Sequence, residues 1–147
     1  MFDIGDNNFS NKFMMECLKK IADELKSVSV NEMYHVIIEY GEEMEPFPGV
    51  FMTEENKVKG CINKAYIYSE LKNGKIYYNG HSESKIVNGY IAILIKCLNG
   101  LRREEIKKTK KNIEKFLERI NIQANLTPSR ANAFGNIYQL MIDKANI

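Results

Sequence analysis

The stretch Lys57-Val-Lys-Gly-Cys-Ile-Asn-Lys-Ala-Tyr-Ile-Tyr68 places a Gly60-Cys61 pair just before a run of strongly β-forming residues. We expect a strand over 65–71, with Cys61 in the turn that enters it. Lys72-Asn-Gly-Lys75 follows, and an Asn-Gly pair is a strong signal for a two-residue hairpin turn. The return strand is expected over 75–79. The sequence therefore predicts a small antiparallel sheet with Cys61 in the turn before its central strand.

Helical patterns flank this sheet on both sides in the sequence. Apolar residues recur there at spacings of three and four, which is typical of one buried face of an amphipathic helix. The cap residues predict helices that begin at Ser10 or Asn11, at Asn31, at Ser82, and at Pro128 with Thr127 as N-cap, and a charged helix over 102–120.

The helix after Ser82 is the most apolar and is expected to be the central buried one, with Gly89 allowing a close approach to the sheet. Residues 1–8 are expected to be a loose start, and Pro46-Phe-Pro-Gly49 cannot be helix interior. The expected fold class is α+β: a small antiparallel β-sheet packed by about five helices, in a single domain over residues 1–147.

Composition argues against several classes of protein. The chain has 147 residues and a net charge of +2, which gives no strong case for nucleic-acid or anionic-membrane partners. The basic run Lys107-Lys-Thr-Lys-Lys111 lacks aromatic residues and is interpreted as a solvated helix face. No apolar run approaches the roughly 20 residues of a membrane-spanning helix. The polar N-terminus lacks the pattern of a signal peptide, so we expect a cytoplasmic protein.

The three cysteines have different settings. Their odd number and the lack of a C-x-x-C pair make a disulfide framework or a structural zinc site unexpected. Cys17 and Cys97 lie on apolar helical stripes and are interpreted as small buried hydrophobic residues. Cys61 has a loop setting, and a thiol attacks as a thiolate, which nearby positive charge favours. The residues alone leave open whether Cys61 is reactive or fills space beneath the sheet.

Charged residues around Cys61 support the reactive interpretation. Lys57, Lys59 and Lys64 are near it in sequence and would supply positive potential. Arg130 lies in the first turn of the last helix, where a cation is unfavourable to the helix dipole, which indicates another use for it. A cysteine hydrolase would need a histidine base, for which only His35 and His81 are available, and His81 is kept as the alternative. No phosphate-binding or dinucleotide motif is present, and no metal or other cofactor is expected.

Four short segments occur in an order and spacing that identify a family. They are Tyr40-Gly41 with Pro46-Phe-Pro48, Asn56-Lys-Val-Lys-Gly-Cys61, Gly80-His-Ser-Glu-Ser-Lys-Ile-Val-Asn-Gly89 and Leu126-Thr-Pro-Ser-Arg130. Over about residues 34–143 the chain resembles the SufE family of sulfur-acceptor proteins, which work with cysteine desulfurases in iron–sulfur cluster assembly. The chain departs from the family pattern at Ile62-Asn63, at Tyr66 and at Ala133-Phe134. His81 also replaces an acidic residue, whereas Glu83 keeps the second charge.

The resemblance implies the α+β fold of the IscU/NifU-type scaffolds and a role for Cys61. That thiol would accept sulfane sulfur from the persulfide of a SufS-like desulfurase, whose pyridoxal phosphate belongs to the partner, and pass it to a SufB-like scaffold. Arg130 would stabilise the thiolate, and Glu83 would control the loop or the partner. His81 is a further auxiliary residue of the predicted site. An apolar resting pocket for the cysteine is also implied, with Ile62 beside it.

Other interpretations remain open. One alternative is a non-catalytic docking or regulatory module in which Cys61 is incidental. No nucleic acid and no membrane is expected as partner, and the oligomeric state is open between monomer and homodimer.

Overall fold

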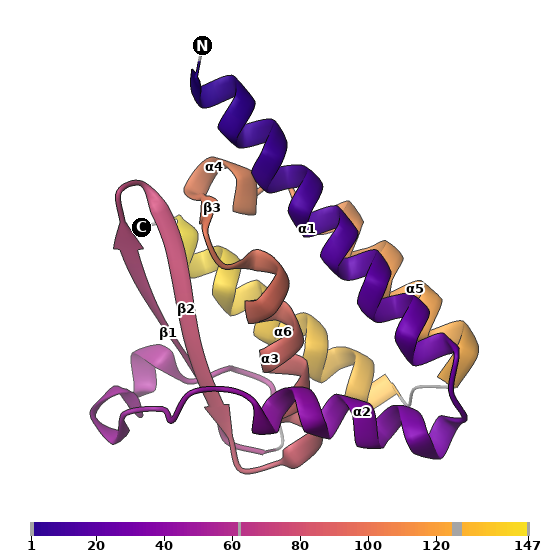
Figure 1. Ribbon diagram of the computed structural model, residues 1–147. Helices are drawn as coiled ribbons and strands as arrows, with labels where there is room; N and C mark the ends of the chain where they lie inside the picture. The colour runs from indigo at the N-terminus through magenta and orange to yellow at the C-terminus, as the bar shows by residue number, and fades with distance from the viewer. Residues whose placement is uncertain (1, 62, 125–127, 147) are drawn as a thin grey trace.

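The computed structural model describes residues 2–61, 63–124 and 128–146 and has an antiparallel sheet with helices packed on one side (Figure 1). The sheet order is β1-β2-β3, so the strand that follows Cys61 is an edge strand, and the prediction that it is the central one is wrong. The elements are α1 (Phe2–Lys26), α2 (Val30–Glu42), the 3₁₀ turns η1 (Gly49–Phe51) and η2 (Glu54–Asn56), β1 (Ala65–Lys72), β2 (Lys75–Ser82), α3 (Lys85–Leu98), β3 (Leu101–Arg102), α4 (Arg103–Ile106), α5 (Lys110–Ala124) and α6 (Pro128–Ala145). The expected α+β class is confirmed.

The β1–β2 hairpin forms at the predicted Asn-Gly pair. Asn73 and Gly74 have φ values of 53° and 79°, and a type I′ turn requires positive φ at both positions. The ladder continues until Ala65 pairs with Ser82, so β2 is longer than the predicted strand over 75–79. The prediction of Ser82 as helix N-cap is therefore wrong. Ser84 caps α3 instead, and its hydroxyl accepts a hydrogen bond from the N–H of Val87 at 3.3 Å.

Helix α3 is the central buried helix, as expected, but the prediction for Gly89 is wrong. A Cβ on Gly89 would lie 2.2 Å from the carbonyl oxygen of Ile37, so this glycine admits α2 rather than the sheet. The close approach between sheet and helix occurs at Gly80 on β2, where a Cβ would lie 2.5 Å from Cγ2 of Ile91. Two glycines thus allow α3 to pack tightly on both neighbours.

Helices α1 and α5 lie side by side on the flank away from the hairpin (Figure 1). Helix α1 begins at Phe2, so the predicted N-cap at Ser10 or Asn11 is wrong. Helix α1 also packs on α3, and there Cys17 forms a disulfide with Cys97 across a Cα–Cα distance of 5.5 Å. The expectation of no disulfide is therefore wrong, because the two apolar stripes that carry these cysteines face each other.

The predicted helix over 102–120 is divided into three elements. Leu101 pairs with Ile76, which adds β3 to the free edge of β2. After α4, the buried Thr109 ends the turn: its hydroxyl donates to the carbonyl of Ile106 at 2.7 Å and is also 2.7 Å from the hydroxyl of Tyr138 on α6. These contacts fix the break between α4 and α5 against α6.

Two other predicted helix starts have different outcomes. Helix α2 is capped by Ser29, whose hydroxyl accepts from the N–H of Glu32 at 3.3 Å, and not by Asn31. Helix α6 begins at Pro128 as predicted, whereas the cap Thr127 lies outside the described residues. Among the described helices, none has the length and hydropathy to cross a membrane.

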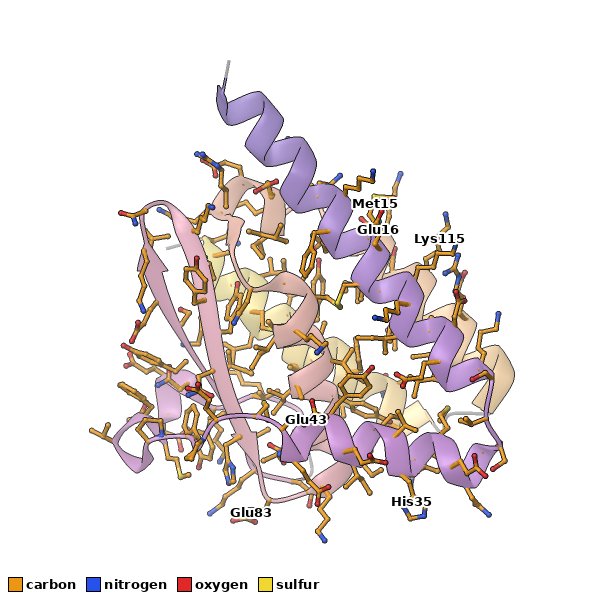
Figure 2. All side chains as sticks on the ribbon, in the orientation of Figure 1. Met15, Glu16, His35, Glu43, Glu83 and Lys115 are labelled. Carbon is orange, nitrogen blue, oxygen red and sulfur yellow. A yellow bond between two sulfur atoms is a disulfide. The ribbon has the colours of Figure 1, made fainter. Side chains whose placement is uncertain are left out.

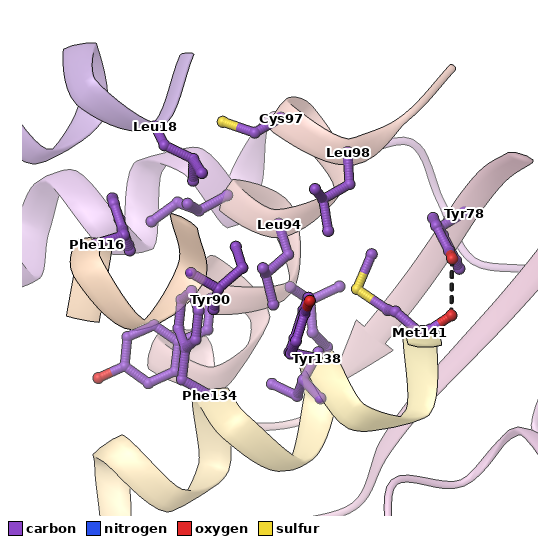
Figure 3. Close-up of a cluster of buried hydrophobic side chains, with 14 of the residues drawn as sticks. Leu18, Tyr78, Tyr90, Leu94, Cys97, Leu98, Phe116, Phe134, Tyr138 and Met141 are labelled. Carbon is purple, nitrogen blue, oxygen red and sulfur yellow. Dashed lines mark hydrogen bonds between the residues drawn. The ribbon is translucent and has the colours of Figure 1, made fainter. Parts of the chain in front are cut away.

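The core between α3, α5 and α6 is aromatic at one end (Figure 3). The centre of the Phe134 ring lies 5.4 Å from the centre of the Tyr90 ring, which it meets edge to face. It lies 5.8 Å from the centre of the Phe116 ring. At the other end the hydroxyl of Tyr78 donates to the carbonyl of Met141 at 2.7 Å, which ties the sheet to α6 (Figure 3). This packing holds the N-terminal parts of α3 and α6 side by side.

Candidate functional site

Gly60 fixes the turn that carries Cys61. Its φ of +81° is in the left-handed region, and a Cβ at this position would lie 2.8 Å from the side-chain nitrogen of Asn136 on α6. At the base of the same loop Lys57 forms a β-bridge with Tyr66, and the N–H of Val58 donates to the carbonyl of Ala65 at 2.8 Å. The cysteine loop is therefore closed at its base by backbone pairing and pressed against α6 near its tip.

Cys61 lines a cavity of about 410 Å³ between this loop and the first turns of α3 and α6. The lining includes Ser84 and Tyr90 from α3 and Arg130 and Ala133 from α6. The guanidinium carbon of Arg130 lies 4.5 Å from the centre of the Tyr34 ring on α2, so this arginine reaches across the cavity's rim to a third helix. Ile62, proposed beside the cysteine from the sequence, lies outside the described residues.

Burial sets the direction in which the pKa of the Cys61 thiol is shifted. Cys61 is half-buried, and desolvation raises the pKa of its thiol above the usual value. The lysines expected to lower that pKa are placed differently: Lys57 is 3.9 Å from a carboxylate oxygen of Glu54, and Lys57 and Lys59 line a separate cavity with Asp143. The prediction of lysine activation is therefore wrong for the resting protein, in which Cys61 is a neutral thiol at neutral pH.

The other predicted site residues lie apart from this cavity. His81 pairs with Tyr66 in the hairpin, and its ring stacks on Phe47 at 6.2 Å, so it does not line the cavity of Cys61. Glu83 is exposed between β2 and α3 and is also absent from the lining. His35 is exposed on α2 and its side chain points away from the body of the protein (Figure 2). Of the charged residues singled out with Cys61, the structure brings Arg130 to the same cavity.

Cys61 is the free cysteine of the chain, since Cys17 and Cys97 are joined. Among the described residues, no three or more His, Cys, Asp or Glu side chains converge as metal ligands would. The site therefore offers one thiol, one guanidinium and a partly apolar enclosure.

Sequence reasoning missed Tyr90 and Tyr34. In the sequence Tyr90 follows Gly89 in an otherwise aliphatic stripe, and this tyrosine is the one local signal for it. In the structure Tyr90 is 3% exposed and lines the cavity, and its hydroxyl has no hydrogen-bond partner among the described residues. Tyr34 on α2 has no local signal in the sequence, and its ring lies against the guanidinium of Arg130.

Comparison with known proteins gives concordant matches. Residues 19–145 match the family model SufE, described as an Fe-S metabolism associated domain. The chain is 37% identical over 129 residues to an uncharacterized SufE-like protein of Synechocystis, covering 87% of this chain and 79% of the relative. It is 35% identical over 107 residues to the cysteine desulfuration protein SufE of Wigglesworthia glossinidia brevipalpis, covering 72% and 73%.

A solved structure shares the fold. The solution structure of a hypothetical protein from Thermus thermophilus superposes with a TM-score of 0.70 at 18% identity, covering 88% of this chain and 93% of that one. The family model extends over most of the chain and includes the loop of Cys61 and the start of α6. The chain therefore belongs to the SufE family, the Fe-S metabolism associated domain.

Proposed function

We propose that this protein is a sulfur acceptor that takes sulfane sulfur from a cysteine desulfurase onto Cys61. The observation that carries the proposal is the setting of the free thiol, which lines a cavity together with Arg130 on a loop held by Gly60. The name of the Wigglesworthia relative, cysteine desulfuration protein, supports the same chemistry.

The transfer is an exchange at sulfur and needs no external oxidant. The Cys61 thiolate attacks the outer sulfur of the donor's persulfide, and the S–S bond of the donor breaks as the new one forms. The donor cysteine leaves as a thiolate and receives the proton that Cys61 gave up. The product is a Cys61 persulfide beside a regenerated donor thiol.

The resting site and the reacting site have to differ in electrostatics. Burial keeps the Cys61 thiol neutral, which protects it from oxidants because the thiolate is the reactive form. On docking, exposure of the loop and the charge of Arg130 would favour the thiolate, and we assign Arg130 this role. Glu83 is exposed and His81 packs beside Phe47, so we assign both to contact with the partner or control of the loop.

The finer parts of the proposal concern partners. We propose a SufS-like desulfurase that carries the pyridoxal phosphate, stimulation of that enzyme on docking, and delivery of the sulfur to a SufB-like iron–sulfur scaffold. This chain would hold no cofactor of its own. We further propose that residues 1–147 act as one SufE-like domain in the cytoplasm.

Intact mass spectrometry tests the central step. The protein is mixed with a cysteine desulfurase and L-cysteine and measured without reductant, with Cys61→Ser as control. We expect a gain of one sulfur atom that reductant removes and that the control lacks. A stable complex without added sulfur would support the docking-module alternative instead. Arg130→Gln should slow the gain while the fold is retained; an unchanged rate removes the role given to Arg130.

A further inference from the structure

Tyr90 is a buried tyrosine whose hydroxyl group has no partner in the described structure. The other two buried tyrosines of the core are satisfied: the hydroxyl of Tyr78 donates to Met141, and that of Tyr138 pairs with Thr109. Burying a hydroxyl without a hydrogen bond costs free energy, so such a group in a folded protein requires an explanation. At Tyr90 the missing partner is therefore expected to come from something the site binds.

The location of Tyr90 narrows the choice of partner. Tyr90 lines the cavity of Cys61 and Arg130, and its ring is fixed edge to face on Phe134 (Figure 3). Burial raises the pKa of Tyr90 to about 12, against a smaller lowering by the charge of Arg130. The hydroxyl is therefore protonated at neutral pH and is available as a hydrogen-bond donor.

Cys61 itself does not satisfy this donor in the resting protein, because the Tyr90 hydroxyl makes no hydrogen bond to it. One added sulfur atom would extend the side chain of Cys61 by an S–S bond of about 2 Å. The cavity of about 410 Å³ has room for it, since a water molecule in the liquid takes only about 30 Å³. A persulfide can therefore reach farther into the cavity than the thiol does.

We propose that Tyr90 is a positioning residue whose hydroxyl donates a hydrogen bond to the sulfane sulfur of the Cys61 persulfide while that sulfur rests in the cavity. The proposal rests on the proposed function, because it concerns the sulfur that Cys61 would accept. A hydrogen bond to the anionic form is stronger than one to the neutral form, so the contact favours the deprotonated persulfide. Tyr90 would thus hold the sulfur in place and lower the pKa of the persulfide.

The test compares wild type with Tyr90→Phe, which removes only the hydroxyl and keeps the ring on Phe134. Cys61 is loaded with inorganic polysulfide: its thiolate takes one outer sulfur, and a shorter polysulfide leaves. The alkylation rate of the persulfide by iodoacetamide is then followed against pH by mass spectrometry. We expect the midpoint of the alkylation rate against pH to lie about one pH unit higher for Tyr90→Phe than for wild type. A shift of this size corresponds to the loss of a hydrogen bond to a charged group. Tyr138→Phe, which loses a buried hydroxyl outside the cavity, should match wild type.

A second measurement uses wild-type protein alone and does not depend on the folding of a variant. In protein labelled with ¹³C at Cζ of tyrosine, loading of Cys61 should move the NMR signal of Tyr90 and leave that of Tyr138 in place. A superimposable pH profile for Tyr90→Phe, or an unmoved Tyr90 signal, overturns the inference. Neither result touches the proposed function, which fails separately if wild type gains no sulfur from a desulfurase.

Discussion

Gly60 packs closely on Asn136 of helix α6: a Cβ at Gly60 would lie 2.8 Å from the side-chain nitrogen of Asn136, so the Asn136 side chain or the cysteine loop would have to shift. The backbone of Gly60 is also left-handed, with φ of +81°. Any other residue there would meet both a steric and a conformational penalty. The position of Cys61 over its cavity therefore depends on a contact with a helix that lies 76 positions farther along the chain, at Asn136.

Replacement of Gly60 by alanine should displace the cysteine loop. We expect a loss of about 1–2 kcal/mol in the free energy of unfolding, from the left-handed backbone, together with slower sulfur acceptance by Cys61. Gly74→Ala is the matched control, because Gly74 has φ of +79° but nothing within 4 Å of its added Cβ. The control should lose similar stability in urea unfolding yet accept sulfur at the wild-type rate. Equal acceptance rates in both variants would contradict the role given to the Gly60 contact.

The crossing of α2 and α3 should be the least tolerant point of the helical layer. A methyl group at Gly89 would lie 2.2 Å from the carbonyl oxygen of Ile37, and backbone cannot yield as a flexible side chain does. We expect Gly89→Ala to cost about 3 kcal/mol or more, the upper range for overpacking. Gly135→Ala on α6 meets nothing within 4 Å and should stabilise the helix by about 0.5–1 kcal/mol. In thermal unfolding, the midpoint temperature should fall below that of wild type for Gly89→Ala and rise above it for Gly135→Ala. A Gly89→Ala variant as stable as wild type would disprove the tight crossing of α2 and α3.

The hairpin and the last helix were predictable because their signals are local. Asn73-Gly74 specifies its own turn, and Pro128 fits the first position of α6 whatever packs against it. The strand β3 was not predictable, because Leu101 and Arg102 form a two-residue strand only through pairing with β2. The Cys17–Cys97 disulfide links residues separated by 80 positions and likewise follows from tertiary packing alone.

The residues of the site were likewise predictable only where a local sequence motif marks them. A motif indicated Cys61 and Arg130, but it could not indicate that His81 stays within the β-ladder and stacks on Phe47. Tyr90 could not be recognised from the sequence, because a tyrosine on an apolar helical stripe is typical of a core residue. Only the structure shows that its hydroxyl has no hydrogen-bond partner among the described residues. The prediction that lysines lower the pKa of the Cys61 thiol failed for a similar reason. Lys57 and Lys59 are near Cys61 in sequence, but they line a separate cavity.

Reduction of the Cys17–Cys97 disulfide should weaken the fold without touching the site. A cross-link across 80 positions removes much chain entropy from the unfolded state, so we expect the free energy of unfolding to fall by about 2–4 kcal/mol on reduction. Urea unfolding with and without reductant measures this difference, and Cys61→Ser should show the same change as wild type. In the unreduced, unfolded protein one thiol should titrate with a thiol reagent. If three thiols reacted with the reagent, the disulfide would be absent.

The raised pKa of Cys61 predicts a thiol that reacts slowly until the protein unfolds. Burial places the folded pKa above the unfolded value of about 8.5, so the folded thiol holds its proton at pH values where the unfolded one has lost it. Iodoacetamide should therefore alkylate native Cys61 more slowly than the urea-unfolded chain at pH 7–8, and the ratio should shrink as pH passes the folded pKa.

The same shift sets the sign of the pH dependence of stability. Between the two pKa values the folded state binds more protons than the unfolded state, so the contribution of Cys61 falls as pH rises from about 8.5 through the folded pKa. Cys61→Ser lacks this group and should lose less stability over that interval than wild type. Faster alkylation of the native thiol than of the unfolded one would instead mean that a nearby cation, such as Arg130, already outweighs burial in the resting protein.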